Sequence, residues 1–149
     1  MTYSAPCTNA RTAAEIAGFT RHRLAAAIQR QAFHPERPAR ARVAREFTAA
    51  DVVRLAAVNA LSRMGLPLAD ADRAAAIITL PVKPDSALAV TPAGPQVRAE
   101  VVPAGALPLL ARKGVIALDL NTLAARVLAA LEARSGRALP TLNTPGAPE

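Results

Sequence analysis

The pattern Thr-Ala-Ala followed by an acidic residue occurs twice in the first third of the chain and constrains its fold more than any other feature. It begins at Thr12 and Thr48 and ends at Glu15 and Asp51. In a capping box of this form, the threonine oxygen accepts a hydrogen bond from the backbone N–H three residues later, and the acid accepts one from the threonine N–H. The two patterns therefore predict two helix starts.

The residues after the first pattern predict a helix, a tight turn and a second helix. Gly18 tolerates the positive φ that would end the first helix near Ala17, and Phe19 supplies an apolar anchor. Thr20 has the side chain of an N-cap, so we expect a second helix from there to about Gln31.

The next segment, residues 32–46, is basic and interrupted by Pro35 and Pro38, which exclude a regular helix. Arginines alternate there with Ala and Val, which favours an extended, hairpin-like excursion. A third helix is then predicted over 48–64 and a short fourth helix over 69–77.

The second half of the chain changes character after two prolines near residue 80. Alternating apolar and polar residues predict a β-hairpin with strands at 87–91 and 96–102, joined by a turn at 92–95. We further expect a short helix at 107–112 and a third strand at 115–120.

A last helix is predicted from a cap at Asn121 or Thr122 to Arg134. Its apolar residues fall on one stripe, formed by Leu123, Val127, Leu128 and Leu131. Such a stripe can pack within the same chain or form a seam between two copies.

Arginine is concentrated in the first half of the chain. Residues 1–65 contain ten arginines and four acidic residues, a net charge of +6 within a chain total of +7. Arginine keeps its charge at any working pH, and its planar guanidinium can bind phosphate or guanine through two bonds. This segregation favours a nucleic-acid partner.

Other functions are disfavoured by what the sequence contains. The single cysteine, Cys7, is typical of a reducing compartment, and we find no secretion signal and no apolar span long enough for a membrane. We therefore expect a cytoplasmic, nucleoid-associated protein with no membrane contact. A phosphate-binding glycine loop, an activated nucleophile and a zinc-ligand pattern are all missing from the sequence, so we expect no enzyme activity, metal or cofactor.

The order of these elements resembles the DNA-binding domain of the MerR family. The residues that carry the resemblance are Thr-Ala-Ala-Glu-Ile-Ala at 12–17, Gly-Phe-Thr at 18–20, Phe-Thr-Ala-Ala-Asp-Val-Val-Arg-Leu at 47–55 and Gly-Leu-Pro-Leu at 65–68. They extend over roughly residues 10 to 76. Where family members commonly have Arg-Tyr-Tyr in the recognition helix, this chain has three alanines at 25–27.

The resemblance implies that the first half of the chain is a mostly helical winged helix-turn-helix. Together with the strands and helices predicted after it, this gives an α+β protein with a small αβ module in its C-terminal half. The resemblance places the start of a recognition helix in the major groove and arginines of the wing along the DNA backbone or in the minor groove. The residues expected to contact DNA are Thr20, Arg21, His22, Arg23, Arg30, Arg37, Arg40, Arg42 and Arg45. Because sensors of metals or oxidants in this family use cysteines near a long dimerising helix, and no cysteine follows Cys7, we expect neither kind of sensing.

The predicted organisation is a flexible leader at 1–9, a DNA-binding domain at 10–78, a linker at 79–86, an αβ module at 87–135 and a disordered tail at 136–149. The expected function is that of a sequence-specific bacterial transcriptional regulator that binds double-stranded DNA as a homodimer. Two alternatives remain open. One is an architectural or phage-type DNA-binding protein, resembling an excisionase or a DNA-packaging recognition subunit. The other is a protein-interaction module whose C-terminal half binds a protein partner while the basic half localises it.

Overall fold

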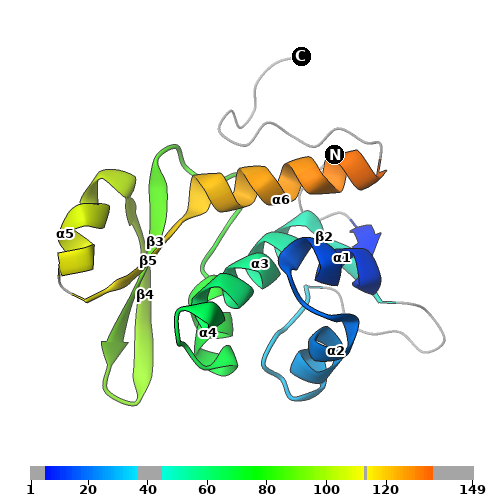
Figure 1. Cartoon of the computed structure of the whole chain (residues 1–149), viewed down its shortest axis with the longest axis horizontal. Coiled ribbons are helices and arrows are strands. Elements are labelled where there is room, and N and C mark those ends of the chain that lie inside the picture. The colour runs from blue at the N-terminus through cyan, green and yellow to red at the C-terminus, as the bar shows by residue number, and fades with distance from the viewer. Residues whose placement is uncertain (1–5, 37–44, 113, 136–149) are drawn as a thin grey trace.

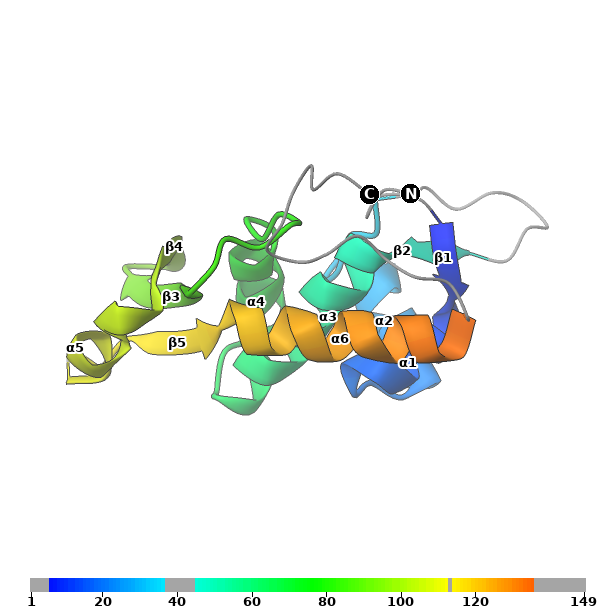
Figure 2. The same cartoon turned by 90° about the horizontal axis from the view of Figure 1, so that it is seen from above.

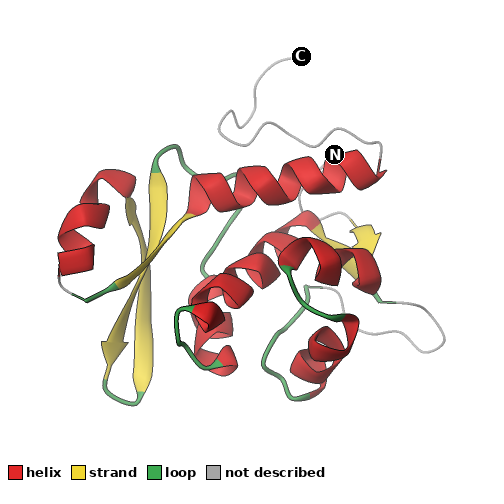
Figure 3. Cartoon of the chain, viewed as in Figure 1, coloured by secondary structure: helices red, strands yellow, loops and turns green. Residues whose placement is uncertain are grey.

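The computed structural model describes residues 6–36, 45–112 and 114–135. The fold is mixed α+β, with a helical N-terminal part followed by a three-stranded antiparallel sheet and further helices (Figures 1 and 3). Its elements are, in chain order, β1 (Pro6–Asn9), α1 (Ala10–Ala17), α2 (Arg21–Gln29), β2 (Glu46–Thr48), α3 (Ala49–Arg63), α4 (Leu68–Ala75), β3 (Ser86–Ala93), β4 (Gln96–Pro103), the 3-10 turn η1 (Ala104–Ala106), α5 (Leu107–Arg112), β5 (Ile116–Asp119) and α6 (Leu120–Ser135).

The first helix begins earlier than its sequence pattern predicts. The predicted cap at Thr12 is wrong, because α1 starts at Ala10 and its N-cap is Asn9, whose Oδ1 accepts a hydrogen bond from the Thr12 N–H at 2.9 Å. β1 pairs with β2 and holds Asn9 in an extended conformation, which places its carboxamide where a cap must lie.

The caps of the next two helices are confirmed. Thr20 Oγ1 accepts from the Arg23 N–H at 3.0 Å at the start of α2. At the start of α3, Thr48 Oγ1 accepts from the Asp51 N–H at 3.0 Å, and Asp51 Oδ2 accepts from the Thr48 N–H at 3.1 Å. Both bonds of the predicted capping box are thus present.

The last four residues of the predicted leader form a strand. β1 runs antiparallel to β2, with Asn9 opposite Glu46 and Pro6 opposite Thr48. The first five residues lie outside the part of the chain that the structure describes. This two-stranded ribbon therefore joins the start of α1 to the start of α3.

The predicted hairpin and third strand are confirmed and form one sheet of order β4-β3-β5, antiparallel throughout. Val90 of β3 lies opposite Ala99 on β4 and Ile116 on β5. The central strand is covered on both faces, since each residue from Ala87 to Val90 is at most 1% exposed. This part of β3 is the core of the C-terminal half.

The final helix is preceded by a cap that the sequence analysis placed wrongly. The Thr122 N–H donates to Asp119 Oδ1 at 3.1 Å, so Asp119 supplies the cap at the start of α6. Asn121 has another role, because its Oδ1 accepts from the Ser86 N–H at 2.7 Å and ties the start of α6 to the start of β3.

α6 spans the two halves of the protein. It leaves the sheet and runs alongside α3 and α1, so that the sheet and α5 lie at one end of the molecule and α1, α2 and β1 at the other (Figure 2). Its apolar stripe is buried within the chain, which confirms the core interpretation, and belongs to the same hydrophobic cluster as Phe47 and Leu55; its members are Leu123, Val127, Leu128 and Leu131. Among the described helices, none is both long and apolar enough to cross a bilayer.

Candidate nucleic-acid interface

The turn between α1 and α2 is fixed by Gly18. This glycine has φ +88°, and a Cβ at its position would lie 2.6 Å from the Nδ2 atom of Asn59 on α3. The N–H groups of Gly18 and Phe19 both donate to Ala14 O, at 2.9 and 2.8 Å. Because Phe19 is 4% exposed, the turn is held on both sides and sets the direction in which α2 leaves.

α2 buries one side and presents a basic first turn to solvent. Leu24 and Ala27 are buried, whereas Arg21, His22 and Arg23 are all exposed, as a recognition helix requires. α2 has no acidic residue in its first turn, and the helix dipole adds positive potential there. This helix end therefore favours an anionic partner.

The most outward face of α2 is polar and small rather than basic. At about 100° per residue, His22 and Gln29 lie opposite the buried Leu24, with Ala25 beside them, and all three are exposed. Arg21 lies on one flank of this face and Arg23 on the other. His22 and Gln29 therefore lie at the centre of the exposed face of α2, between the two arginines.

Gln29 was not among the residues that the sequence analysis selected. Its spacing of seven residues from His22 puts the two on the same helical face, and that spacing is the signal that could have found it. A glutamine amide can pair with adenine through two hydrogen bonds in the major groove.

Arg23 is held by an aromatic ring. Its guanidinium carbon lies 4.9 Å from the centroid of the Phe19 ring, within the range of a cation–π contact. The contact orients Arg23 without neutralising it, so its N–H groups stay available for phosphate.

The remaining predicted contact residues divide into two groups. Arg30 is exposed at the C-cap of α2, on the same side as Arg23, and Arg45 is half-buried just before β2. Arg37, Arg40 and Arg42 of the predicted wing lie outside the described residues.

A comparison with known protein families finds a match for the N-terminal part of the chain. Residues 9–76 match the family described as MerR HTH family regulatory protein. Residues 9–76 are a MerR-family helix-turn-helix domain. The match includes α1, α2, α3 and α4 and ends one residue after α4, in the segment that leads to β3. A search of curated proteins finds no match to this chain.

A MerR helix-turn-helix domain implies a DNA-binding transcriptional regulator, in a family whose members are typically not enzymes. Within the matched residues, α1, the turn at Gly18 and α2 follow one another as helix, turn and helix. In helix-turn-helix proteins the second of these helices is the one that enters the major groove. The sheet and α6 lie outside the matched residues.

The MerR domain anchors the residues immediately before the predicted wing. Glu36 donates its backbone N–H to Asp51 Oδ1 at 2.9 Å, and its carboxylate accepts from Thr48 Oγ1 at 3.0 Å and from Arg54 at 3.1 Å. Arg54 also donates from Nε to the carbonyl of Ile78 at 3.1 Å. Glu36 is therefore bound to the start of α3 and, through Arg54, linked to the segment that follows α4.

The pKa of the buried Asp51 departs from its ordinary value. Desolvation is the main cause that raises the pKa of Asp51 above its ordinary value, and the negative charge of Glu36 raises it further. The N–H groups of Thr48 and Glu36 act in the opposite direction because they donate to the ionised form. Asp51 is therefore a structural acid that organises this corner of the domain.

Other candidate chemical groups have structural partners. His34 Nδ1 lies 2.8 Å from Asp72 Oδ2, which links the segment after α2 to α4. Asp70 pairs with Arg73 at 3.2 Å. No cluster of three or more potential metal ligands occurs in the described portion of the chain.

Proposed function

We propose that this protein is a sequence-specific bacterial transcriptional regulator that inserts α2 into the major groove. His22 and Gln29 face the base edges, Thr20, Arg21, Arg23 and Arg30 contact the flanking phosphates, and the arginines at 37, 40, 42 and 45 follow the backbone or the minor groove. Such a protein acts at the nucleoid, in the cytoplasm.

The observation that carries this proposal is the outward face of α2. Ala25 is exposed and Ala26 is half-buried, so the side chains on either side of His22 and Gln29 on this face are small. Small side chains let a helix backbone approach the base edges closely, which brings the shorter His22 and Gln29 within reach. Arginines on both flanks then meet the two phosphate backbones that border a major groove.

The first test is a salt series of binding to the DNA upstream of the protein's own gene, measured by fluorescence anisotropy. The double variant Arg21→Ala/Arg23→Ala should bind more weakly, and its log–log salt slope should be shallower by about 0.9 for each phosphate that is no longer neutralised. The matched control is Arg112→Ala/Arg126→Ala, which removes the same charge from exposed positions on α5 and α6. Equal reductions in affinity for the two double variants would refute the placement of α2 in the groove.

A second comparison separates base recognition from phosphate contact. Gln29→Ala should reduce the difference in binding free energy between the specific site and unrelated DNA by about 1–3 kcal/mol. The slope of the salt dependence should stay unchanged. If Gln29→Ala weakens binding to the specific site and to unrelated DNA equally, Gln29 makes no base-specific contact.

The edge of the sheet supports a homodimer. β4 pairs only with β3 among the described strands, so no described strand occupies its other edge. Two copies of β4 paired antiparallel about Ala99 would place Arg98 opposite Glu100 of the second copy, and Val97 opposite Val101. β4 is therefore self-complementary in both charge and apolar side chains.

Charge exchange on β4 tests this dimer. Arg98→Glu should shift the protein toward monomer in sedimentation experiments, because it places two glutamates opposite each other. Glu100→Arg should do the same with two arginines. The double variant Arg98→Glu/Glu100→Arg should restore the dimer, since opposite charges again face each other. The residues opposite these two on β3 are Thr91 and Ala89, which are uncharged, so the exchange leaves the fold itself little changed. A double variant as monomeric as the single ones would exclude β4 as the interface.

A further inference from the structure

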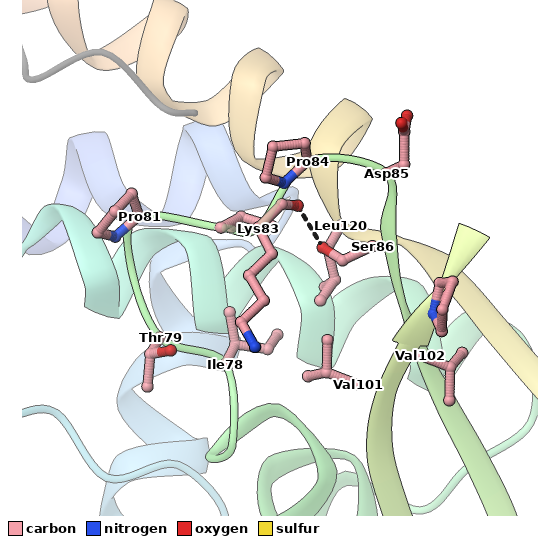
Figure 4. A pocket seen from close by; sticks show the side chains of 12 residues that line it. Ile78, Thr79, Pro81, Lys83, Pro84, Asp85, Ser86, Val101, Val102 and Leu120 are labelled. Atoms are coloured by element: carbon pink, nitrogen blue, oxygen red, sulfur yellow. Dashed lines mark hydrogen bonds between the residues drawn. The ribbon is translucent and has the colours of Figure 1, made fainter. Parts of the chain in front are cut away.

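A cavity of about 500 Å³ lies between the segment that follows the MerR domain and the sheet (Figure 4). Its walls come from three places: the segment between α4 and β3, the end of β4, and the first residue of α6. The volume falls within the range of small-molecule sites in proteins, roughly 300–1,000 Å³. Apolar side chains dominate its lining, among them Ile78, Val82, Val101 and Leu120.

The polar groups of this cavity are few, and one points inward. The side chain of Lys83 runs into the cavity beside Ile78, whereas the carboxylate of Asp85 points away from it (Figure 4). The hydroxyl of Ser86 is already used, because it donates to the carbonyl of Lys83 at 2.8 Å. No ion pair joins Lys83 to another residue in the part of the chain that the structure describes.

We propose that this cavity binds a small organic carboxylate whose apolar body contacts Ile78, Val101 and Leu120 and whose carboxylate pairs with Lys83. Two observations support it. Val101 is 44% exposed although it is a large apolar residue, and a ligand would cover it. A lone ammonium at an apolar wall favours an anion of single charge, because the pair is stronger where water is partly excluded.

The cavity is also connected to the DNA-binding half. The carbonyl of Ile78, a lining residue, accepts from Arg54, and Arg54 pairs with Glu36 directly before the basic segment. A shift of Ile78 caused by a bound ligand would therefore be transmitted through Arg54 to Glu36, the residue directly before the basic segment. This regulatory part rests on the function proposed above, whereas the binding site itself does not.

The binding site is tested without DNA. Octanoate and 2-naphthoate are titrated into the full chain by calorimetry and by NMR, with 1-octanol and 2-naphthol as uncharged counterparts. We expect saturable binding of at least one carboxylate, roughly tenfold tighter than its neutral counterpart. Lys83→Gln should remove that preference, whereas Arg112→Gln, the same charge change at an exposed position on α5, should keep it.

Two results would overturn the site. One is the failure of both carboxylates to bind saturably. The other is an equal preference for the carboxylate in Lys83→Gln and in the unchanged protein.

The link to DNA is tested with the carboxylate that binds. At saturation it should change the Kd for the specific DNA by about fivefold or more, and Arg54→Met should abolish that change while ligand binding remains. An unchanged Kd in a protein that binds both partners would refute the link and leave the site intact. Absence of specific DNA binding both with and without the ligand would refute the proposed function instead, so the two failures are distinguishable.

Discussion

Single residues decide where the helices of this protein begin and end. Thr20 and Thr48 act as caps, as their sequence patterns predict. Each side-chain oxygen accepts a hydrogen bond from the backbone N–H three residues later, which has no partner within the helix. Thr12 carries the same pattern and fails, since Asn9 caps α1 instead. The pattern identified a helix start correctly within three residues, and the strand pairing of β1 chose among the neighbouring caps.

Gly18 is the residue whose replacement should affect the DNA-binding half most. Gly18→Ala should lower the free energy of unfolding by more than the roughly 1–2 kcal/mol that a left-handed residue costs, because its Cβ would also collide with Asn59. Urea denaturation measures the change. Gly65→Ala is the matched control, with φ +107° and no atom within 4 Å of the added Cβ, so it should cost the conformational strain alone. Equal costs would show that the contact with Asn59 does not constrain the turn.

Among the helices and strands, α6 is the element that joins the two halves. One of its ties is the ion pair between Arg134 near its end and Glu15 on α1. The hydrogen bond from Arg134 is the main cause that lowers the pKa of Glu15, and Arg11 on α1 adds to it. Both arginines favour the ionised carboxylate in the folded protein.

The pH dependence of this tie has a definite sign. A carboxyl group with a lowered pKa stabilises the fold above its ordinary value, near 4.5, and the stabilisation is lost as the pH falls through the lowered pKa. Arg134→Gln should therefore be slightly less stable than the unchanged protein at pH 7, and the difference should shrink on acidification below pH 4.5. Urea titrations at several pH values measure it. The comparison variant Arg126→Gln, exposed on the same helix, should show no such convergence.

Across the molecule as a whole, the two predicted modules share one core. A single cluster of buried side chains includes Leu24 of α2, Leu55 of α3, Leu88 of β3 and Leu131 of α6. The segment at 79–86, predicted as a linker, connects the two parts along the chain. It also contributes the buried Val82 to this cluster. A shared core couples the stability of the sheet to that of the DNA-binding half.

Leu131→Ala should test that coupling. It removes a side chain that is 2% exposed, so the free energy of unfolding should fall by about 2–5 kcal/mol. Amide signals of α3 and of β3, followed by NMR in urea, should disappear together at a lower midpoint. Leu109→Ala, which truncates a leucine that is 56% exposed on α5, should leave the midpoint nearly unchanged. Separate midpoints for α3 and β3 would show two independent units.

The local features of this protein follow directly from its sequence. Capping residues, Gly18, the prolines and the apolar periodicity specify nearly every helix and strand, because each depends on neighbours within a few residues along the chain. The arginines that follow the turn at Gly18 likewise indicate a basic recognition helix from the order of residues alone.

Features that depend on residues far apart in the chain were settled by tertiary packing. In the folded chain the apolar stripe of α6 lies in the core. Asn121, an expected cap, instead accepts a hydrogen bond from Ser86. Arg54 links Glu36 to Ile78. The fold also placed Gln29 beside His22 on the outward face of α2, by showing which side Leu24 buries. These outcomes follow from packing and long-range hydrogen bonds, whose partners the local sequence does not specify.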